Sequence, residues 1–240
     1  MKILKGELTD HPRGNIYAQK KKAIVIGATG ATGAKLVRLL LDSDNWDKVT
    51  TISRKAVLNG EKHNKLNEII IDSFDRLDDT VDSWKDHDSF FNCIGTTRKL
   101  AGGAKQFVDI EYVFSLKCAE LAFNADIPNA SVLSAGGANA NAWAVNWIHP
   151  LLYTKTIGMK EETLTKHFSF RNVSIFRPGM LMRYYDKTSS MQRFFNKSNL
   201  GLPVKSLASA IKRDAESMSS GDNNIFIYTG NKCINSVIII

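Results

Sequence analysis

Short apolar runs alternate with longer amphipathic segments between residues 23 and 176. The apolar runs predict strands at 23–26, 48–55, 68–72, 89–94, 130–133 and 173–176. The segments between them predict helices at 34–41, 76–85, 105–125 and 153–167. Regular alternation of strand and helix is typical of an α/β fold, in which helices cover both faces of a parallel sheet. We therefore expect a doubly wound parallel sheet in a three-layer α/β/α arrangement.

The pattern continues without a linker or a repeat, which indicates a single domain over residues 1–240. Hydrophobic residues make up 43% of the 240 residues, enough to bury one substantial core. Residues 1–21 predict a polar N-terminal extension with no secretory signal or transit peptide. Residues 183–240 predict a small, less regular C-terminal region for a substrate or partner, with a helix at 206–217 and a strand at 224–228. No apolar stretch reaches the roughly 18–20 residues that cross a bilayer.

Gly27-Ala28-Thr29-Gly30-Ala31-Thr32-Gly33 joins the first predicted strand to the first predicted helix. In a dinucleotide-binding Rossmann turn the first glycine makes the tight turn, the second admits a pyrophosphate, and the third lets the helix pack on the strand. The helix N-terminus then attracts the anion. The GxxGxxG spacing differs from GxGxxG, but its strand and helix context predicts the same role. The alternative is a structural turn that holds no ligand.

The end of the second predicted strand indicates which dinucleotide is preferred. An acidic residue at this place binds the ribose of NAD, whereas an arginine accommodates the 2′-phosphate of NADP. Ser53 and Arg54 stand there, and no carboxylate occurs between Val49 and Asn59. The sequence therefore favours NADP(H). The alternative is that Arg54 and Lys55 form a solvated strand end.

The charge and the cysteines narrow the classes of partner. The formal charge is +8, but apart from Lys20-Lys21-Lys22 the basic residues are scattered, so we expect no nucleic-acid partner. A basic groove around a phosphate of NADP accounts for part of the excess. The five histidines show no ligand spacing, and the three cysteines are far apart, so we expect neither a metal site nor a disulfide framework. A reducing cytoplasm suits these cysteines.

Four separated segments resemble the atypical short-chain dehydrogenase/reductases typified by the Tat-interacting protein, an NADPH-binding, oxidoreductase-like family. The segments are 26–33, Cys93-Ile94-Gly95-Thr96-Thr97-Arg98, Val108-Asp109 to Tyr112-Val113, and Phe176-Arg177-Pro178-Gly179. They occur in the order of the family. The resemblance spans about residues 22 to 182 and weakens through the C-terminal quarter.

The resemblance implies positions for most of the cofactor. Arg54 would bind the 2′-phosphate, and Asp72 with Ser73 would meet the adenine edge. Gly95 and Thr96 would pass under the nicotinamide ribose. The pyrophosphate would be bound by Gly27, Thr29, Gly30, Ala31 and Thr32, with Gly33 completing the glycine motif, and the nicotinamide end would be closed by Pro178 within Arg177-Pro178-Gly179. Two alternatives stay open: Asp72 only caps the following turn, and Gly95 only breaks its strand.

The resemblance also implies a catalytic tyrosine, a lysine four residues later, and a serine after the fifth strand. Tyr153 and Ser134 stand at the first and third of these places, but Ile157 stands where the lysine is expected. Lys155 lies on nearly the opposite helix face. Lys160 lies two turns along the face of Tyr153 and reaches back only if the helix is locally irregular. The alternative for Tyr153 is an aromatic side chain that fills core volume.

Two functions follow from these residues. The first is an NADP-dependent reductase of a carbonyl or enone, weak for want of a lysine, with Tyr153 as proton donor and Ser134 as its partner. The second is a non-catalytic NADP(H)-binding regulator that acts through a protein partner. The aromatic segment 141–147 suits an apolar substrate and suits a partner helix equally well.

Overall fold

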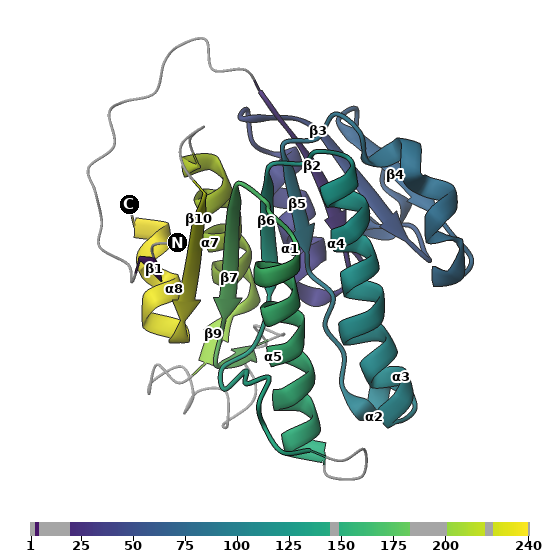
Figure 1. The fold of residues 1–240 in the computed structure, drawn as a ribbon. Helices are drawn as coiled ribbons and strands as arrows, with labels where there is room; N and C mark the ends of the chain where they lie inside the picture. The colour runs from purple at the N-terminus through teal and green to yellow at the C-terminus, as the bar shows by residue number, and fades with distance from the viewer. Residues whose placement is uncertain (1–2, 5–19, 145–148, 183–200, 219–222, 240) are drawn as a thin grey trace, which may run out of the picture.

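The computed structural model describes residues 3–4, 20–144, 149–182, 201–218 and 223–239 (Figure 1). Its strands are β1 (Ile3–Leu4), β2 (Lys21–Ile26), β3 (Trp46–Ser53), β4 (Leu66–Ile70), β5 (Ser89–Asn92), β6 (Asn129–Leu133), β7 (Asn172–Arg177), β8 (Met180–Met182), β9 (Gly201–Pro203) and β10 (Asn224–Thr229). Its α-helices are α1 (Ala31–Leu41), α2 (Arg98–Ala101), α3 (Ala104–Val108), α4 (Ser115–Asn124), α5 (His149–His167), α7 (Val204–Ser217) and α8 (Gly230–Ile239). The remaining helical segments are the 3₁₀ segments η1 (Leu58–Gly60) and η2 (Phe74–Trp84) and the π-helix η3 (Asp109–Phe114).

The strands build one parallel sheet in the order β4-β3-β2-β5-β6-β7-β10-β1, and β8 pairs with β9 separately. The chain moves outward from β2 to β3 and β4, then returns to place β5 on the other side of β2. Strand order therefore reverses between β2 and β5, and this confirms the predicted doubly wound parallel sheet. Ligands of such sheets bind beyond the carboxyl ends of the strands at the reversal.

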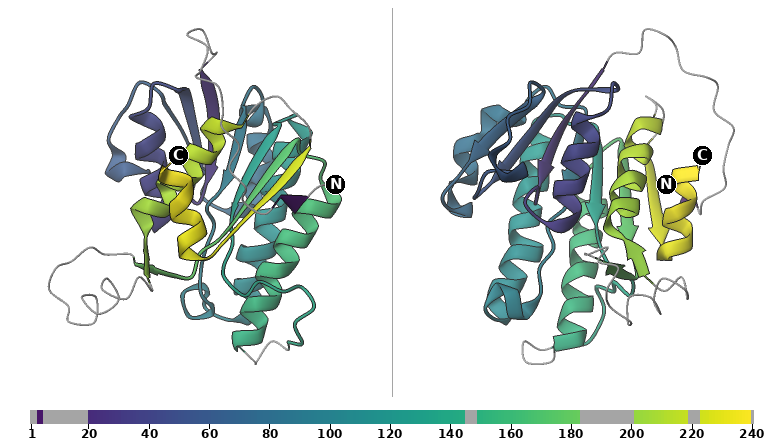
Figure 2. Two further views of the ribbon diagram at one scale, coloured as in Figure 1. Left: turned by 90° about the vertical axis from the view of Figure 1, so that its left-hand side faces the viewer. Right: turned by 180° about the vertical axis from the view of Figure 1, so that it is seen from behind.

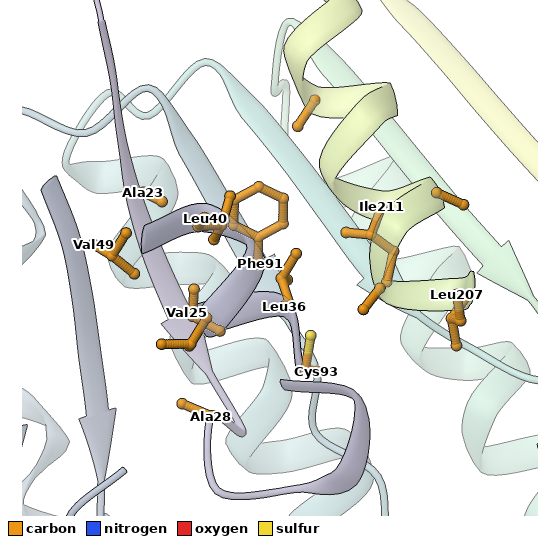
Figure 3. Close-up of a cluster of buried hydrophobic side chains, with 14 of the residues drawn as sticks. Ala23, Val25, Ala28, Leu36, Leu40, Val49, Phe91, Cys93, Leu207 and Ile211 are labelled. Carbon is orange, nitrogen blue, oxygen red and sulfur yellow. The ribbon is translucent and has the colours of Figure 1, made fainter. Parts of the chain in front are cut away.

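Helices cover both faces of the sheet, with α4 and α5 in front and α1 and α7 behind in the view of Figure 1 (Figures 1 and 2). Ala23 and Val25 of β2 pack in the cluster that contains residues of α1, α7 and α8 (Figure 3). Ile24 and Ile26 pack in the other cluster, which contains residues of η2, α4 and α5. Burial on both faces explains why residues 23–26 of β2 form a continuous apolar run with no polar alternation.

Two predicted helices differ from the observed segments. Residues 76–85 lie largely in the 3₁₀ segment η2, where side chains bond to nearby backbone: Ser73 accepts from the Asp75 amide, and the Thr80 hydroxyl donates to the Leu77 carbonyl at 2.6 Å. Such bonds compete with the α-helical pattern. Residues 105–125 form α3, the π-helix η3 and α4 in succession rather than one α-helix. The helix therefore has a wider turn at residues 109–114.

The C-terminal region contains more regular structure than the sequence predicts. After residue 200, α7 packs against α1, β10 extends the main sheet beside β7, and α8 packs against α7. At the other end of the chain, Lys21 starts β2, and its ammonium donates to the Ala215 carbonyl at the end of α7 at 2.6 Å.

None of the described helices combines the length and the apolar composition that crossing a membrane requires.

Asp214 of α7 is buried in this region. The Tyr228 hydroxyl donates a hydrogen bond to Asp214 Oδ1. Burial raises the pKa of Asp214 to about 6, because desolvation outweighs the hydrogen bonds and the nearby Lys21 charge, which favour ionisation. A carboxyl whose pKa is raised on folding stabilises the fold while it is protonated, and this contribution is lost as the pH rises through about 6.

We predict that Asp214→Asn stabilises the protein at about pH 8 by roughly 1–3 kcal/mol, since the amide keeps the acceptor for Tyr228 and carries no charge. The gain should vanish near pH 4, where Asp214 is protonated in the native state. Urea denaturation between these pH values measures the difference. Asp44→Asn, at an exposed carboxylate, serves as the matched control. A gain that does not change with pH would contradict the assignment.

Candidate functional site

Two glycines of the 27–33 loop are required by the fold itself. Gly27 has φ of 77°, and a Cβ there would lie 2.6 Å from the carbonyl carbon and oxygen of Cys93. A Cβ at Gly33 would lie 2.2 Å from the Gly27 carbonyl oxygen. The loop after β2 therefore lies directly on the chain that leaves β5, and α1 starts close beneath it.

A Cβ at Gly30 would lie 3.2 Å from the Gly27 carbonyl oxygen, whereas a Cβ at Gly95 would meet open space. Gly30 is the N-cap of α1 with no side-chain cap, and the first turn of α1 contains no acidic residue. The first amides of a helix lack intrahelical acceptors, so this end of α1 offers donors and a positive dipole to an anion. No atom lies within 4 Å of a Cβ built on Gly95, and its φ is not positive. Neither packing nor backbone conformation thus requires glycine at Gly95, and the opening leaves room for a ligand beyond β5.

The other residues of the glycine loop differ in exposure. Thr29 and Ala31 are exposed, whereas Thr32 is buried. Across the reversal of the sheet, the Cys93 amide donates to the Ile26 carbonyl at 2.9 Å and holds the two loops together. The glycine loop and the residues after β5 are therefore adjacent at the strand reversal, and parallel sheets bind their ligands in a crevice at this position.

Arg54 lies just past the carboxyl end of β3, the strand beside β2, and is exposed. Its guanidinium carbon is 4.5 Å from the ring centroid of Phe74, a cation–π arrangement. Phe74 in turn stacks on Phe114 of η3, with ring centroids 3.8 Å apart. The Arg54 side chain thus has a fixed support, which Phe74 supplies. Phe74 was not among the expected site residues, although an aromatic residue directly after Asp72-Ser73 was a signal.

Asp72 and Ser73 follow β4, which ends two residues earlier than predicted. The Asp72 carboxylate is exposed and lies 3.8 Å from the Arg76 guanidinium. Ser73, rather than Asp72, caps the next segment, because its hydroxyl oxygen accepts from the Asp75 amide at 3.3 Å. The assignment of both residues to the adenine edge stays a prediction.

Thr96 is connected to Lys160 through a residue of the π-helix. The Thr96 amide donates to Glu111 Oε1, and the Lys160 ammonium lies 3.1 Å from Glu111 Oε2. The side chains of Lys160 and Glu111 are each only 2% exposed. The sequence placed Lys160 toward Tyr153 on the condition of an irregular helix; the structure instead pairs its ammonium with Glu111, which was not among the expected site residues.

Ser134 also has a carboxylate partner. It is buried after β6, and its hydroxyl donates to Glu161 Oε1. Arg177 Nε donates to the same Glu161 oxygen at 2.9 Å, and hydrogen bonding to Glu161 raises the pKa of Arg177. The hydroxyl proton of Ser134 is thus directed at Glu161, and the role of Ser134 toward a substrate carbonyl stays a prediction. Glu161 was missed as well; its only signal was its place beside Lys160 in the sequence of a predicted helix.

Tyr153 is half-buried on α5, and its ring centroid lies 5.8 Å from that of Phe107. This contact agrees with the packing alternative, and the role of Tyr153 as a proton donor stays a prediction. Ile157, one turn later, is buried. Gly158 must be glycine, because a Cβ would lie 2.2 Å from the Ala140 nitrogen, so the loop after β6 packs on α5 at this point.

Pro178 is buried directly after β7, and its carbonyl accepts from the Gly136 amide at 2.8 Å. The segment after β7 is thereby joined to the loop after β6, at the same edge of the sheet as the crevice. In the aromatic segment 141–147, Trp143 is 69% exposed, and Trp147 lies outside the described residues.

Known proteins resemble this chain in sequence over most of its length. No family model matches the chain. The chain is 31% identical over 236 residues to Protein HTATIP2 of Rattus norvegicus, covering 91% of this chain and 93% of that protein. It is 30% identical over 161 residues to the protein named "FMP52, mitochondrial" of Meyerozyma guilliermondii, covering 67% and 65% of the two chains.

Two solved structures show the same Rossmann fold at low sequence identity. The oxidoreductase ylbE of Lactococcus lactis has a TM-score of 0.65 and 17% identity, covering 91% of this chain and 95% of that one. The enzyme WbmH of Bordetella bronchiseptica, solved in complex with NAD+, has a TM-score of 0.64 and 15% identity, covering 88% and 75%.

The different space around Gly95 and Gly33 predicts different effects of substitution on stability and on dinucleotide binding. Gly95→Val should leave the melting temperature nearly unchanged, since nothing lies near the added carbon, but should weaken binding of a nicotinamide dinucleotide by about tenfold or more. Gly33→Ala should lower the melting temperature by at least about 5 °C, because its Cβ meets the Gly27 carbonyl. Thermal unfolding and calorimetric titration give both values. Undiminished dinucleotide binding by Gly95→Val would contradict a site at this opening.

Proposed function

The chain belongs to the family of Protein HTATIP2, the atypical short-chain dehydrogenase/reductases, and from this premise we propose that it binds NADP(H) in the crevice at the strand reversal. The observation that carries the proposal is Arg54, an exposed cation supported on Phe74 at the end of β3, where an NAD-preferring site has a carboxylate. The structurally similar WbmH is described in complex with NAD+. The chain's own residues favour the phosphorylated cofactor.

The residues at the strand reversal would meet this cofactor from one end to the other. The uncapped N-terminus of α1, with Gly27, Thr29, Gly30, Ala31 and Thr32, would hold the pyrophosphate. Arg54 would bind the 2′-phosphate, and Asp72 with Ser73 would lie at the adenine. The nicotinamide ribose would lie over the opening at Gly95 and Thr96, with Pro178 nearby. The bound cofactor would supply a hydride or accept one.

We further propose slow reduction of a carbonyl or enone, with Tyr153 donating a proton to the substrate oxygen. Ile157 contributes no charge one turn from Tyr153, and the Lys160 ammonium is paired with Glu111. Because Ser134 donates to Glu161, it orients a substrate only if that bond is exchanged. These three features reduce the expected rate.

The same features favour a second candidate, a non-catalytic NADP(H)-binding regulator that acts on a protein partner. The exposed Trp143 in the segment after β6 suits either an apolar substrate or a partner surface. We retain the cytoplasm as the proposed compartment, where the free thiols of Cys93, Cys118 and Cys233 would remain reduced. The FMP52 relatives are named as mitochondrial, so localisation of the tagged full chain is the test that separates the two compartments.

Cofactor preference tests the main proposal. We predict that the protein binds NADPH roughly ten- to hundredfold more tightly than NADH, because a charge-assisted contact with the 2′-phosphate is worth about 1.5–3 kcal/mol. Arg54→Ala should remove most of this preference without changing NADH affinity. Lys55→Ala, at the exposed neighbour, is the control and should keep the preference. Calorimetric titration decides, and equal affinities of the wild type for both cofactors would refute the NADP assignment.

Turnover separates the two candidate functions. If the chain is a reductase, NADPH oxidation with a reactive quinone should fall at least about tenfold in Tyr153→Phe, a conservative lower bound for a positioned proton donor. Tyr112→Phe is the matched control, since the Tyr112 hydroxyl lies 3.1 Å from the Thr163 hydroxyl and takes no part in the proposed reaction. Background rates in all three proteins would favour the regulator.

A further inference from the structure

Lys160 and Glu111 form a buried ion pair, and Glu111 also contacts the loop after β5. Both side chains are shielded from water, and Lys160 Nζ lies 3.1 Å from Glu111 Oε2. Replacing a buried pair by apolar residues of similar volume is often neutral or stabilising, so stability alone does not explain the pair. Its geometry offers another explanation, because the two oxygens of Glu111 have different partners.

Glu111 connects two elements that are distant in sequence. Oε2 faces the Lys160 ammonium of α5, and Oε1 accepts the Thr96 amide of the loop after β5. A buried carboxylate without a cation would take up a proton or lose its position. The Lys160 ammonium beside Oε2 keeps Glu111 oriented, and the acceptor for the Thr96 amide remains in place.

The loop that contains Thr96 is held at its other end by the glycine turn. The backbone of Cys93 and Ile94 lies against Gly27, within 2.6–2.8 Å of where a Cβ would stand. Between these two attachments lies Gly95, the residue with open space around it. The position of Thr96 therefore sets how the opening at Gly95 faces the crevice.

The π-helix makes this connection possible and extends it. Residues 109–114 form a wide helical turn, which carries Glu111 toward Thr96 and Lys160. The same turn carries Phe114, on which Phe74 and then Arg54 are stacked. One segment thus supports both proposed ends of the cofactor.

We propose that Lys160 is a positioning residue for the cofactor loop, acting through Glu111 and the Thr96 amide and not by touching the cofactor or Tyr153. The inference rests on the proposed NADP(H) function. In this proposal Lys160 holds the loop with Gly95 and Thr96 in position under the nicotinamide ribose. The lysine expected at Ile157 would instead act beside Tyr153.

Two double variants of the full chain test the proposal. The acceptor-retaining variant, Lys160→Met with Glu111→Gln, removes both charges but keeps an oxygen for the Thr96 amide. The acceptor-free variant, Lys160→Met with Glu111→Met, removes the charges and the acceptor, and the flexible, unbranched methionine can fill the space of either native side chain. Both double variants should melt within a few degrees of the wild type. The single variant Lys160→Met leaves a buried carboxylate unpaired and should lower the melting temperature by about 10 °C.

The readouts are calorimetric titration with NADPH and hydrogen exchange at the Thr96 amide without cofactor. The acceptor-retaining variant should keep NADPH affinity within about threefold and should keep Thr96 protected. The acceptor-free variant should bind NADPH about tenfold more weakly or worse, the loss of one hydrogen bond, and should exchange Thr96 at least about tenfold faster. Should the acceptor-free variant fail to fold, Glu111→Leu with Lys160→Met takes its place.

Either of two outcomes would overturn the proposal. Undiminished NADPH affinity and Thr96 protection in the acceptor-free variant would show that Glu111 does not hold the loop. Equal loss of NADPH affinity in both double variants, with Thr96 still protected in the acceptor-retaining one, would show that the ammonium contacts the cofactor directly. If the wild type binds neither NADPH nor NADH, the proposed function fails, and Thr96 exchange alone still decides whether Lys160 and Glu111 position the loop.

Discussion

The contact between the backbone of Gly27 and the backbone of Cys93 and Ile94 determines most of the remaining architecture. A side chain at Gly27 would occupy the space of the Cys93 carbonyl, so the loops after β2 and β5 meet without an intervening atom. Gly33 must then pass beneath the Gly27 carbonyl, which brings the N-terminus of α1 to the same place. The strand reversal, the helix dipole and the open space at Gly95 are therefore adjacent, and an anionic dinucleotide is the ligand that such an arrangement suits.

Buried charge is concentrated on one side of this crevice. Lys160 and Glu161 are neighbours on α5, yet one pairs with Glu111 of the π-helix and the other with Ser134 and Arg177 after β6 and at the end of β7. Each carboxylate has a cation and at least one neutral donor, which is how ionised groups are retained in an interior. Lys160 and Ser134, for which the sequence predicts catalytic roles, each have a buried carboxylate partner, and their catalytic roles stay predictions.

The short π-helix η3 takes part in contacts on both sides of the proposed cofactor site. Its residues contact the proposed adenine side through Phe114 and the proposed nicotinamide side through Glu111. Its wide turn interrupts what would otherwise be a single helix over residues 104–124. A local irregularity of this kind is frequent at functional sites, and here it places two unlike side chains toward the two ends of one crevice.

The sequence by itself determined the doubly wound parallel sheet, the succession of its central strands along the chain, the glycine turn and the place of Arg54 at the end of a strand. These features depend on local signals: apolar runs buried on both faces, and glycines whose spacing matches a strand-turn-helix unit. The roles of Thr29, Asp72, Ser73, Thr96 and Pro178 in cofactor binding remain predictions. The 3₁₀ form of η2, the π-helix and the partners of Lys160 and Ser134 were decided by tertiary structure. Glu111 and Lys160 are 49 residues apart, and Ser134 and Glu161 are 27 apart. A charged residue on a helix face carries no local mark of the partner it will meet, because its burial becomes favourable only when another segment brings the opposite charge.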